Sequence, residues 1–437
     1  MWTGAAFTLF FSFLFGGGTI QGLRSDALIQ IISLGLLSIL AWQIDRPFRA
    51  VDGWPLAIVA TLVLLFCGQF IWLPPAIWSK LPGRDLIASV YSATNIDLPW
   101  LPLSLDPAAS WRSALSLIPP IAVFLAVVQL PWRGRRSLSL MLVCFGVVSV
   151  IVGLAQLTLG ERSGLYLYPI SNFGSSVGFF ANRNHYAAFL YSMIPLAAAW
   201  VIGVLGAFEL RLVWLIGLLL AGVTFLLGLG MSQSRAGIVL GIFAAMASML
   251  LAIGSVTRIR KVALTSLFVM SVTAVALVVQ YGLAGILSRL DTGIAADYRL
   301  VFARVTADAA RSFQPIGSGF GTFPAIYPMF EQTNDLVPAF VNHAHNDWFE
   351  VWLEGGWPAI GLAVAFLFWL GRASLRLWRG PIAGQRDIDC AHARAAGISL
   401  LLLMLHSMVD YPLRTSTNMC LFAFLCALII EPPRERA

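Results

Sequence analysis

Long apolar runs recur along the whole chain and constrain its fold more than any other feature. About 20 apolar residues are needed to cross the hydrocarbon core of a bilayer, and about twelve runs reach that length. We therefore predict an all-α polytopic membrane protein in which residues 1–437 form a single integral membrane domain. The predicted spans centre near Phe11, Leu36, Val63, Val123, Val148, Pro195, Leu219, Ala244, Thr273, Ala363, Leu402 and Phe424.

The composition excludes a soluble protein. Only 11% of the residues are charged and the mean hydropathy is +0.82, whereas an average soluble domain carries about 25% charged residues. The first residues, MWTGAAFTLFF, lack the basic region of a cleavable signal peptide, so we expect the first apolar run to remain as a span.

The basic residues indicate how the spans are oriented. Lys and Arg in short loops mark the cytoplasmic side, and their distribution predicts that both termini lie there. A net charge of +7 does not indicate a nucleic-acid partner, because the basic residues form scattered clusters rather than a continuous stripe. The clusters on the predicted inner side are Arg46 and Arg49; Arg133, Arg135 and Arg136; Arg211; Arg258, Arg260 and Lys261; Arg372, Arg376, Arg379, Arg386 and Arg394; and Arg434 and Arg436.

Two segments on the opposite, outer side are long enough to carry structure of their own. Residues 74–111 are rich in Pro and Trp, and residues 287–346 join the ninth and tenth predicted spans. We expect the second segment to be a long outer loop with short helices. It also holds most of the polar residues suited to chemistry, so the outer face is the predicted location of a functional site.

Arg235 is a basic residue on the wrong side for the charge bias. In the turn MSQSRAG, Ser234 is suited to cap the helix that follows, which puts Arg235 in the first helical turn. A cation is disfavoured there by the helix dipole, and an anion bound beside it would reverse that effect. The alternative is an arginine that extends to the membrane interface without a ligand.

The sequence ANRNHYAAFL, residues 181–190, repeats this pattern at the start of the sixth span. Arg183 and His185 flank Asn184, which we expect to be the helix cap. Both side chains are candidates for substrate binding, and a structural role is an equal alternative.

In the outer loop, residues 294–313 have the pattern of an amphipathic helix. Arg304 and Arg311 lie four and three residues from Asp308, so both can be neutralised within the helix. Arg299 has no acidic residue at those spacings. It is therefore expected to meet a substrate anion, unless a carboxylate from elsewhere in the fold reaches it.

His345 lies just ahead of the tenth span, in the sequence HAHNDWFEVWLEGGWPAIG. Asp347 and Glu350 have the spacing of a capping box, which predicts that the helix begins at Asp347. The positive end of its dipole would favour a neutral imidazole, the state that a general base needs. Capping or bridging an interface is the alternative role for His345.

A metal site is not expected. His343 and His345, with Asp347 nearby, fall short of a ligand set. The five cysteines lack metal-binding spacing, with four in predicted spans and Cys390 in a basic loop. We therefore predict neither a metal nor another cofactor.

Ionisable residues within predicted spans are functional candidates by default. Glu350 and Glu354 share a helix face, and His406, Asp410 and Arg414 form a similar stripe in the eleventh span. Because such a stripe can neutralise itself, a structural network is the favoured interpretation. The secondary site candidates are His343, Glu354, His406 and Asp410.

Taken in order, these motifs resemble the O-antigen ligase and O-antigen polymerase superfamily. The resemblance rests on ANRNHYAAFL, on SQSRAG at a helix start, and on an arginine in an outer-loop helix ahead of a GxG turn. It continues through HAHNDWFEVWLEGGWPAIG and HSMVDYPLR, and it runs from about residue 180 to the C-terminal end.

The resemblance implies an inverting, metal-independent glycan transfer from an undecaprenyl diphosphate donor to an acceptor hydroxyl. It places the site on the periplasmic face of a bacterial inner membrane, with lipid A-core or another glycan as acceptor. The family's arginines match Arg235 and Arg299, and its histidine before Asn matches His345. Asn346 and Asp347 would orient that ring or bind sugar hydroxyls.

Other functions remain open at this point. Within the superfamily, they are an exopolysaccharide polymerase and a protein O-glycosyltransferase. A flippase would use the outer arginines as a gate without a base. Asp387 and Asp389 form a DxD motif, which could belong to a metal-dependent enzyme on the cytoplasmic face, although the loop around it is short.

Overall fold

The computed structural model describes residues 1–20, 22–42, 53–206, 212–255, 298–336, 340–379 and 387–431. Over these ranges the protein is all-α, apart from a small two-stranded antiparallel sheet of β1 (Trp72–Leu73) and β2 (Leu101–Pro102). The longer helices are α1 (Trp2–Phe15), α2 (Arg24–Trp42), α3 (Gly53–Gly68), α7 (Ile118–Val128), α8 (Trp132–Leu159), α9 (Arg183–Leu205), α10 (Leu212–Ser232), α11 (Arg235–Ser255), α14 (Tyr298–Ser312), α16 (Asp347–Arg379), α17 (Asp387–His406) and α18 (Ser416–Ile429). The shorter ones are α4 (Pro75–Trp78), α5 (Asp85–Ala93), α6 (Pro107–Leu115), α15 (Phe323–Ile326), η3 (Tyr327–Met329), η4 (Thr333–Asp335) and η5 (Pro412–Arg414).

The apolar helices identify a multi-pass membrane protein. In the described ranges, eight helical segments are long and apolar enough to cross a membrane, and α1, α3 and α18 are shorter apolar helices. Each of these segments contains one of the predicted span centres. The remaining centre, Thr273, lies outside the described residues.

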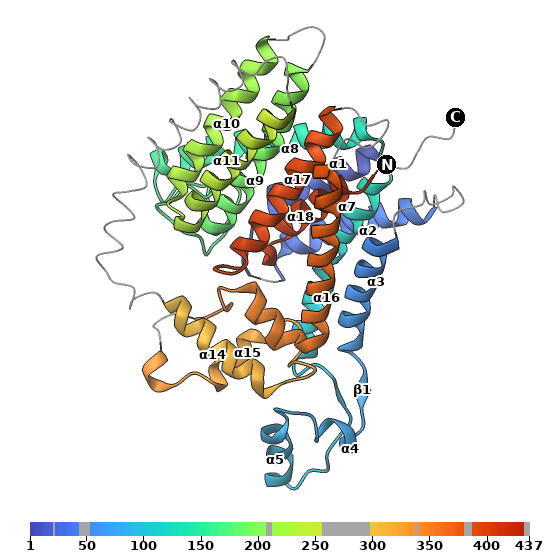
Figure 1. Ribbon diagram of the computed structural model, residues 1–437. Helices are drawn as coiled ribbons and strands as arrows, with labels where there is room; N and C mark the ends of the chain where they lie inside the picture. Colours follow the sequence, from blue (N-terminus) through green and yellow to red (C-terminus); the bar gives the residue numbers. More distant parts are fainter. Residues whose placement is uncertain are drawn as a thin grey trace.

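Helix α9 lies in the middle of the bundle. It packs against α10 and α11 on one side and against α17 on another (Figure 1). Its side chains are apolar around the whole circumference, so that Tyr186, Phe189 and Tyr191 are completely buried. A helix of this kind needs protein neighbours on every side, which explains its central position.

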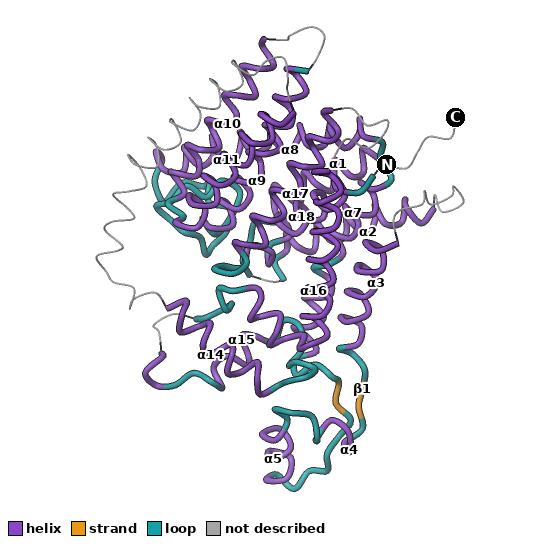
Figure 2. Tube along the Cα trace, in the orientation of Figure 1, coloured by secondary structure: helices purple, strands orange, loops and turns teal. Residues whose placement is uncertain are grey.

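The two ends of the bundle differ in charge and in the elements that cover them. Near Met1, the indole of Trp2 donates to the carbonyl of Gly134 at the start of α8, and Arg136 pairs with Asp389 at the start of α17. We call this the Met1 end. The opposite end is covered by residues 298–336 and 340–346, which include α14, α15, η3 and η4 (Figure 2). We call these residues the loop layer and that end the loop end.

Arg135 lies inside a helix rather than in a loop, because α8 already begins at Trp132. Its side chain is fully buried and donates hydrogen bonds to backbone carbonyls at the ends of α7 and α18. These carbonyls have no partners within their own helices, so a buried arginine satisfies them. Cys390 also differs from the prediction, since it is buried in α17 and not in a basic loop.

Helix α16 is broken at Gly356, where φ is 60°. A side chain there would approach the carbonyl oxygen of Pro315 to 2.2 Å, so the position requires glycine. The backbone N–H of Trp357 donates to that same carbonyl at 2.9 Å. The first part of α16, residues 347–355, is therefore attached to the loop layer. Glu350 and Glu354 lie in this part, and not deep in the span as predicted.

Candidate active site

The carboxylate of Asp410 contacts residues from several of the sequence motifs. It is completely buried in the turn after α17. Its Oδ1 lies 3.4 Å from Nδ1 of His345, and its Oδ2 lies 3.3 Å from Nη2 of Arg299. Asn184, near the start of α9, donates its side-chain amide to the same Oδ2. One carboxylate thus brings together three segments that are far apart in the chain.

Arg299 lies near the start of α14 and its side chain is 33% exposed. The carboxylate that it contacts is Asp410, so the alternative of a partner from elsewhere in the fold is the one observed. Arg311 pairs with Asp308 as predicted. Arg304 does not, because it reaches Asp335 in η4 instead.

His345 lies two residues before α16, with φ at 50°. Its ring stacks on Phe302 with 5.8 Å between centroids and meets Tyr411 edge-on at 4.8 Å. Its Nδ1 faces Asp410, and a carboxylate in that position favours the tautomer with the proton on Nδ1. Nε2 is then the nitrogen that can accept a proton.

Asp410 remains ionised in this setting. Burial opposes its ionisation, but the imidazole of His345 and the guanidinium of Arg299 hold the pKa of this carboxyl below its ordinary value. The prediction that Asp410 belongs to a self-contained stripe with His406 and Arg414 is wrong. Helix α17 ends at His406, so the three residues do not share a helix face.

The three residues of the predicted stripe, His406, Asp410 and Arg414, contact different parts of the protein. Nδ1 of His406 lies 3.1 Å from the hydroxyl of Tyr191, inside the bundle. Asp410 faces His345, as described above. Arg414 belongs to a second cluster on the other side of the turn. His406 is therefore a buried packing residue and does not reach the surface of the site.

Arg414 lies among three carboxylates from the first part of α16. They are Asp347 at 3.4 Å, Glu350 at 3.4 Å and Glu354 at 3.1 Å. His343 adds to this cluster, with its Nδ1 2.8 Å from Oε1 of Glu350. Each of these carboxylates contacts a basic side chain of the protein, as expected if Glu350 and Glu354 have the favoured structural role. His343 belongs to the same cluster.

Glu354 also attaches α16 to the loop layer. Its Oε1 accepts hydrogen bonds from the backbone N–H groups of Gly321 and Phe323, at 2.9 Å and 3.2 Å. The glycine-rich turn at residues 317–321 therefore packs on α16. In this arrangement Glu354 is bound to protein groups on both of its oxygens.

Asn346 and Asp347 do not orient the ring of His345 through any described hydrogen bond. Oδ1 of Asn346 accepts from the N–H groups of Trp348 and Phe349, which makes Asn346 the cap of α16. The helix begins at Asp347 as predicted, but the proposed capping box is wrong. Asp347 accepts instead from the hydroxyl of Ser407 at 2.8 Å.

Arg235 is the first residue of α11, as predicted. The hydroxyl of Ser234 accepts from the N–H of Gly237 at 3.1 Å, which confirms Ser234 as the cap. The same hydroxyl donates to Oδ1 of Asn184 at 2.8 Å. The start of α11 is thus connected to Asn184 and, through it, to Asp410.

The start of α9 differs from the prediction by two residues. Asn182 is the cap, since its Oδ1 accepts from the N–H of Asn184 at 2.7 Å. Arg183 is the first helical residue and is partly exposed. His185 is completely buried, with Nε2 3.9 Å from Oδ1 of Asp410. It therefore packs behind the carboxylate, where a substrate would not reach it.

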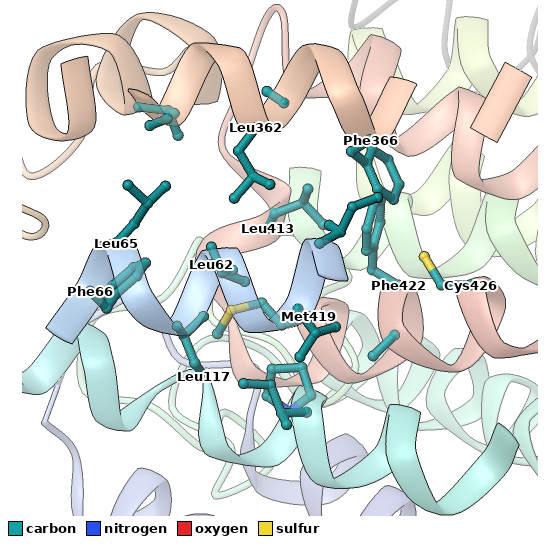
Figure 3. A pocket seen from close by; sticks show the side chains of 18 of the residues that line it. Leu62, Leu65, Phe66, Leu117, Leu362, Phe366, Leu413, Met419, Phe422 and Cys426 are labelled. Carbon is teal, nitrogen blue, oxygen red and sulfur yellow. The ribbon is translucent and has the colours of Figure 1, made fainter. Parts of the chain in front are cut away.

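An apolar cavity of about 390 Å³ lies beside the second cluster, between α3, α7, α16 and α18. Figure 3 shows Leu62, Phe66, Leu362 and Phe422 lining it from three of these helices. Asp347 and Arg414 also contribute to its lining. The cavity is suited to a hydrocarbon chain whose polar end lies near the loop layer.

Asn184 was expected only as a cap, and Asp410 only as a secondary candidate. Two features of the sequence could have pointed to these residues. Asn184 lies inside the motif ANRNHYAAFL, and Asp410 lies inside HSMVDYPLR. Within the described ranges, no three His, Cys, Asp or Glu side chains are grouped as metal ligands would be. The expectation of metal-independent transfer stays a prediction.

Comparison with known protein families gives one match. The family model for O-antigen ligase matches residues 220–364, a range that contains Arg235, Arg299 and His345. No curated protein matches the chain closely enough to be called a relative. The fold and this match define the class of the protein, a multi-pass membrane protein of the glycosyltransferase-like ligase and polymerase type. Over residues 220–364 the match supports the O-antigen ligase superfamily, which confirms the resemblance drawn from the motifs.

Proposed function

We propose that this protein transfers a glycan from an undecaprenyl diphosphate-linked donor to the hydroxyl of an acceptor, with inversion at the anomeric carbon. The observation that carries the proposal is the meeting of His345 and Arg299 at Asp410. Asn184 and Ser234 connect the same carboxylate to the helix start that bears Arg235. The His345–Asp410 pair is thereby connected to the start of α11, and Arg235 is the first residue of that helix.

The donor diphosphate would bind to Arg235 and Arg299. Guanidinium groups form charge-assisted, bidentate hydrogen bonds to phosphate oxygens. Arginine has five N–H donors, so a contact between Nη2 of Arg299 and Asp410 is compatible with a second anion. The N-terminus of α11 adds a favourable dipole for that anion. These groups stabilise the negative charge that develops on the leaving diphosphate.

His345 would act as the general base. Its Nε2 takes the proton from the acceptor hydroxyl, whose oxygen attacks the anomeric carbon. The bond between that carbon and the phosphate oxygen breaks, and the diphosphate leaves with the electron pair. Asp410 holds the ring and stabilises the imidazolium that forms. General base catalysis of this kind contributes roughly 10² to 10⁴ in rate.

The substrates proposed here are lipid-linked. The apolar cavity between α3, α7, α16 and α18 is suited to the prenyl tail of the donor or to a chain of the acceptor. We propose that the acceptor is lipid A-core or another glycan and that the only other partner is membrane lipid. In this proposal the loop end faces the periplasm, the Met1 end and the C-terminus lie on the cytoplasmic side of the inner membrane, and no metal takes part.

The geometry favours this site over the DxD motif at the Met1 end. Asp389 is paired with Arg136, and both Asp387 and Asp389 lie in the first turn of α17. A carboxylate that neutralises a neighbouring arginine is poorly placed to hold a cation. The polymerase, the protein O-glycosyltransferase and the flippase are distinguished by the test that follows.

The test is an in vitro assay with purified protein, undecaprenyl diphosphate glycan and separate candidate acceptors, in the presence of EDTA. Transfer that requires His345 is the expected result. The acceptor that is used separates ligase, polymerase and protein glycosyltransferase. Transport of donor without transfer would indicate a flippase, and a requirement for added metal would contradict the arginine mechanism. His392→Gln, at the buried Met1 end, is the matched histidine control.

A further inference from the structure

Asn184 links the two halves of the proposed site. Its amide nitrogen donates to Oδ2 of Asp410, and its amide oxygen accepts from the hydroxyl of Ser234 at 2.8 Å. Ser234 caps α11, whose first residue is Arg235. Asp410 in turn faces His345. A single side chain therefore connects the proposed diphosphate-binding helix with the proposed base.

The orientation of this amide is fixed by its neighbours. The hydroxyl of Ser234 accepts from the N–H of Gly237, so its own proton is left to donate to Oδ1 of Asn184. The ionised carboxylate of Asp410 can only accept, so it requires the NH₂ side of the amide. Both neighbours are buried, with Ser234 1% exposed and Asp410 0% exposed. Only a side chain that donates on one side and accepts on the other satisfies both.

We propose that Asn184 is a positioning residue that couples donor binding at Arg235 to the orientation of the His345–Asp410 pair. This inference rests on the proposed function. Its amide keeps Asp410 turned toward His345 and keeps the start of α11 at a fixed distance from the base. Asn184 itself contacts neither the base nor the reacting atoms.

The informative substitution is Asn184→Asp, which preserves shape and the acceptor for Ser234 but removes the donor to Asp410. A second carboxylate beside Asp410 favours the protonated form of His345, and a protonated ring cannot act as a base. The other charged or titratable described groups around Asp410 are unchanged, and they are Arg299, His185, His406, Tyr191 and Tyr411. The acid limb of the kcat/KM profile should therefore move to higher pH by about one unit, with kcat at neutral pH lower by up to about tenfold.

Two more variants distinguish the two hydrogen bonds of the Asn184 side chain. Ser234→Ala loses only the connection to α11, so it should raise the KM for the donor several-fold and leave the acid limb in place. Asn184→Ala loses both connections, so it should raise the donor KM and also lower kcat. Asn418→Ala is the matched control, because Asn418 is a buried asparagine that donates to the backbone carbonyl of His185 in the same turn of α9.

The coupling is wrong if Asn184→Asp folds and keeps the wild-type pH profile, or if Asn418→Ala changes kcat and donor KM as much as Asn184→Ala does. If Asn184→Asp fails to fold, Asn184→Ala and Ser234→Ala test the coupling instead. Asn184→Ala should raise the donor KM and lower kcat, whereas Ser234→Ala should raise only the donor KM. If the wild-type protein shows no transfer that depends on His345, the proposed function fails instead. Binding of undecaprenyl diphosphate, measured by native mass spectrometry, then tests the link to α11 alone, and equal affinities of Asn184→Ala and Asn418→Ala would overturn it.

Discussion

Two buried ionic clusters lie on either side of the turn after α17, and they are built in opposite ways. Around Asp410, one carboxylate is shared by a histidine and an arginine whose side chains are 24% and 33% exposed. Around Arg414, one guanidinium is surrounded by three carboxylates, and its side chain is only 14% exposed. The first cluster can be reached from outside, whereas the second is closed.

This difference separates binding groups from supporting ones in a protein with few charges. A closed cluster holds elements together, since burying its members without partners would cost several kcal/mol. A cluster with a partly exposed guanidinium can accept an additional anion. Charge type alone would not have distinguished them, because both contain histidine, arginine and carboxylate.

The largest effect is expected for His345, the proposed general base in the cluster around Asp410. His345→Gln should lower kcat by roughly 10² to 10⁴ because it removes the proton acceptor. Donor affinity should remain, because the arginines are intact. The measurement is steady-state transfer together with binding of undecaprenyl diphosphate. His343→Gln is the control from the closed cluster, and an equal loss of kcat in a folded His343→Gln protein would remove the distinction between the clusters.

The next effect concerns stability. Arg414→Met should destabilise the protein by about 3–5 kcal/mol, because three carboxylates lose their shared cation. Thermal unfolding in detergent, followed by fluorescence or calorimetry, measures this. A variant that unfolds at the wild-type temperature yet loses activity would show that Arg414 acts on substrate and that the second cluster is not merely supporting.

A smaller effect is expected from Arg299→Lys, which keeps the charge but loses the planar fork. The KM for the donor should rise about tenfold, since a bidentate pair becomes a single contact. Arg304→Lys, on the same helix and paired with Asp335, is the matched control. Equal KM values for the two variants would argue against diphosphate binding at Arg299.

The smallest effect is expected in the apolar cavity. Leu362→Trp places a larger side chain in a space of about 390 Å³. It should raise the KM for one lipid-linked substrate a few-fold, because the larger side chain crowds the space, and leave kcat unchanged. Substrates with shortened tails would be affected less. If tail length made no difference in the wild-type protein, the cavity would have no role in binding.

The features predictable from sequence were those set by local patterns. The apolar runs predicted the spans, because the hydrophobic length of a span depends only on the residues of that one segment. The cap at Ser234 and the helix start at Asp347 followed from neighbouring residues. The cap of α9 was misplaced because ANRNHY offers two asparagines, and only the structure shows that Asn182 and not Asn184 takes that role.

The partners across the fold were not predictable from spacing. The residues at helical spacing from Arg299 include no acidic side chain, and its contact with Asp410 joins residues that are 111 positions apart. The His406, Asp410 and Arg414 stripe assumed a helix that continues, whereas α17 ends at His406. That early end is what turns Asp410 toward His345 and Arg414 toward α16.

The break at Gly356 bears on how the protein tolerates different membranes. A continuous α16 would act as a lever, so that any tilt of the span in a thicker or thinner bilayer would be carried into the turns that hold Asp347 and Glu350. Because the helix is broken at Gly356 and the N–H of Trp357 is bonded to the carbonyl of Pro315, the spanning part after Trp357 does not continue the first turns as one straight helix. A mismatch between the length of the span and the thickness of the bilayer is therefore expected to act on the residues after Trp357 and not on the first turns of α16.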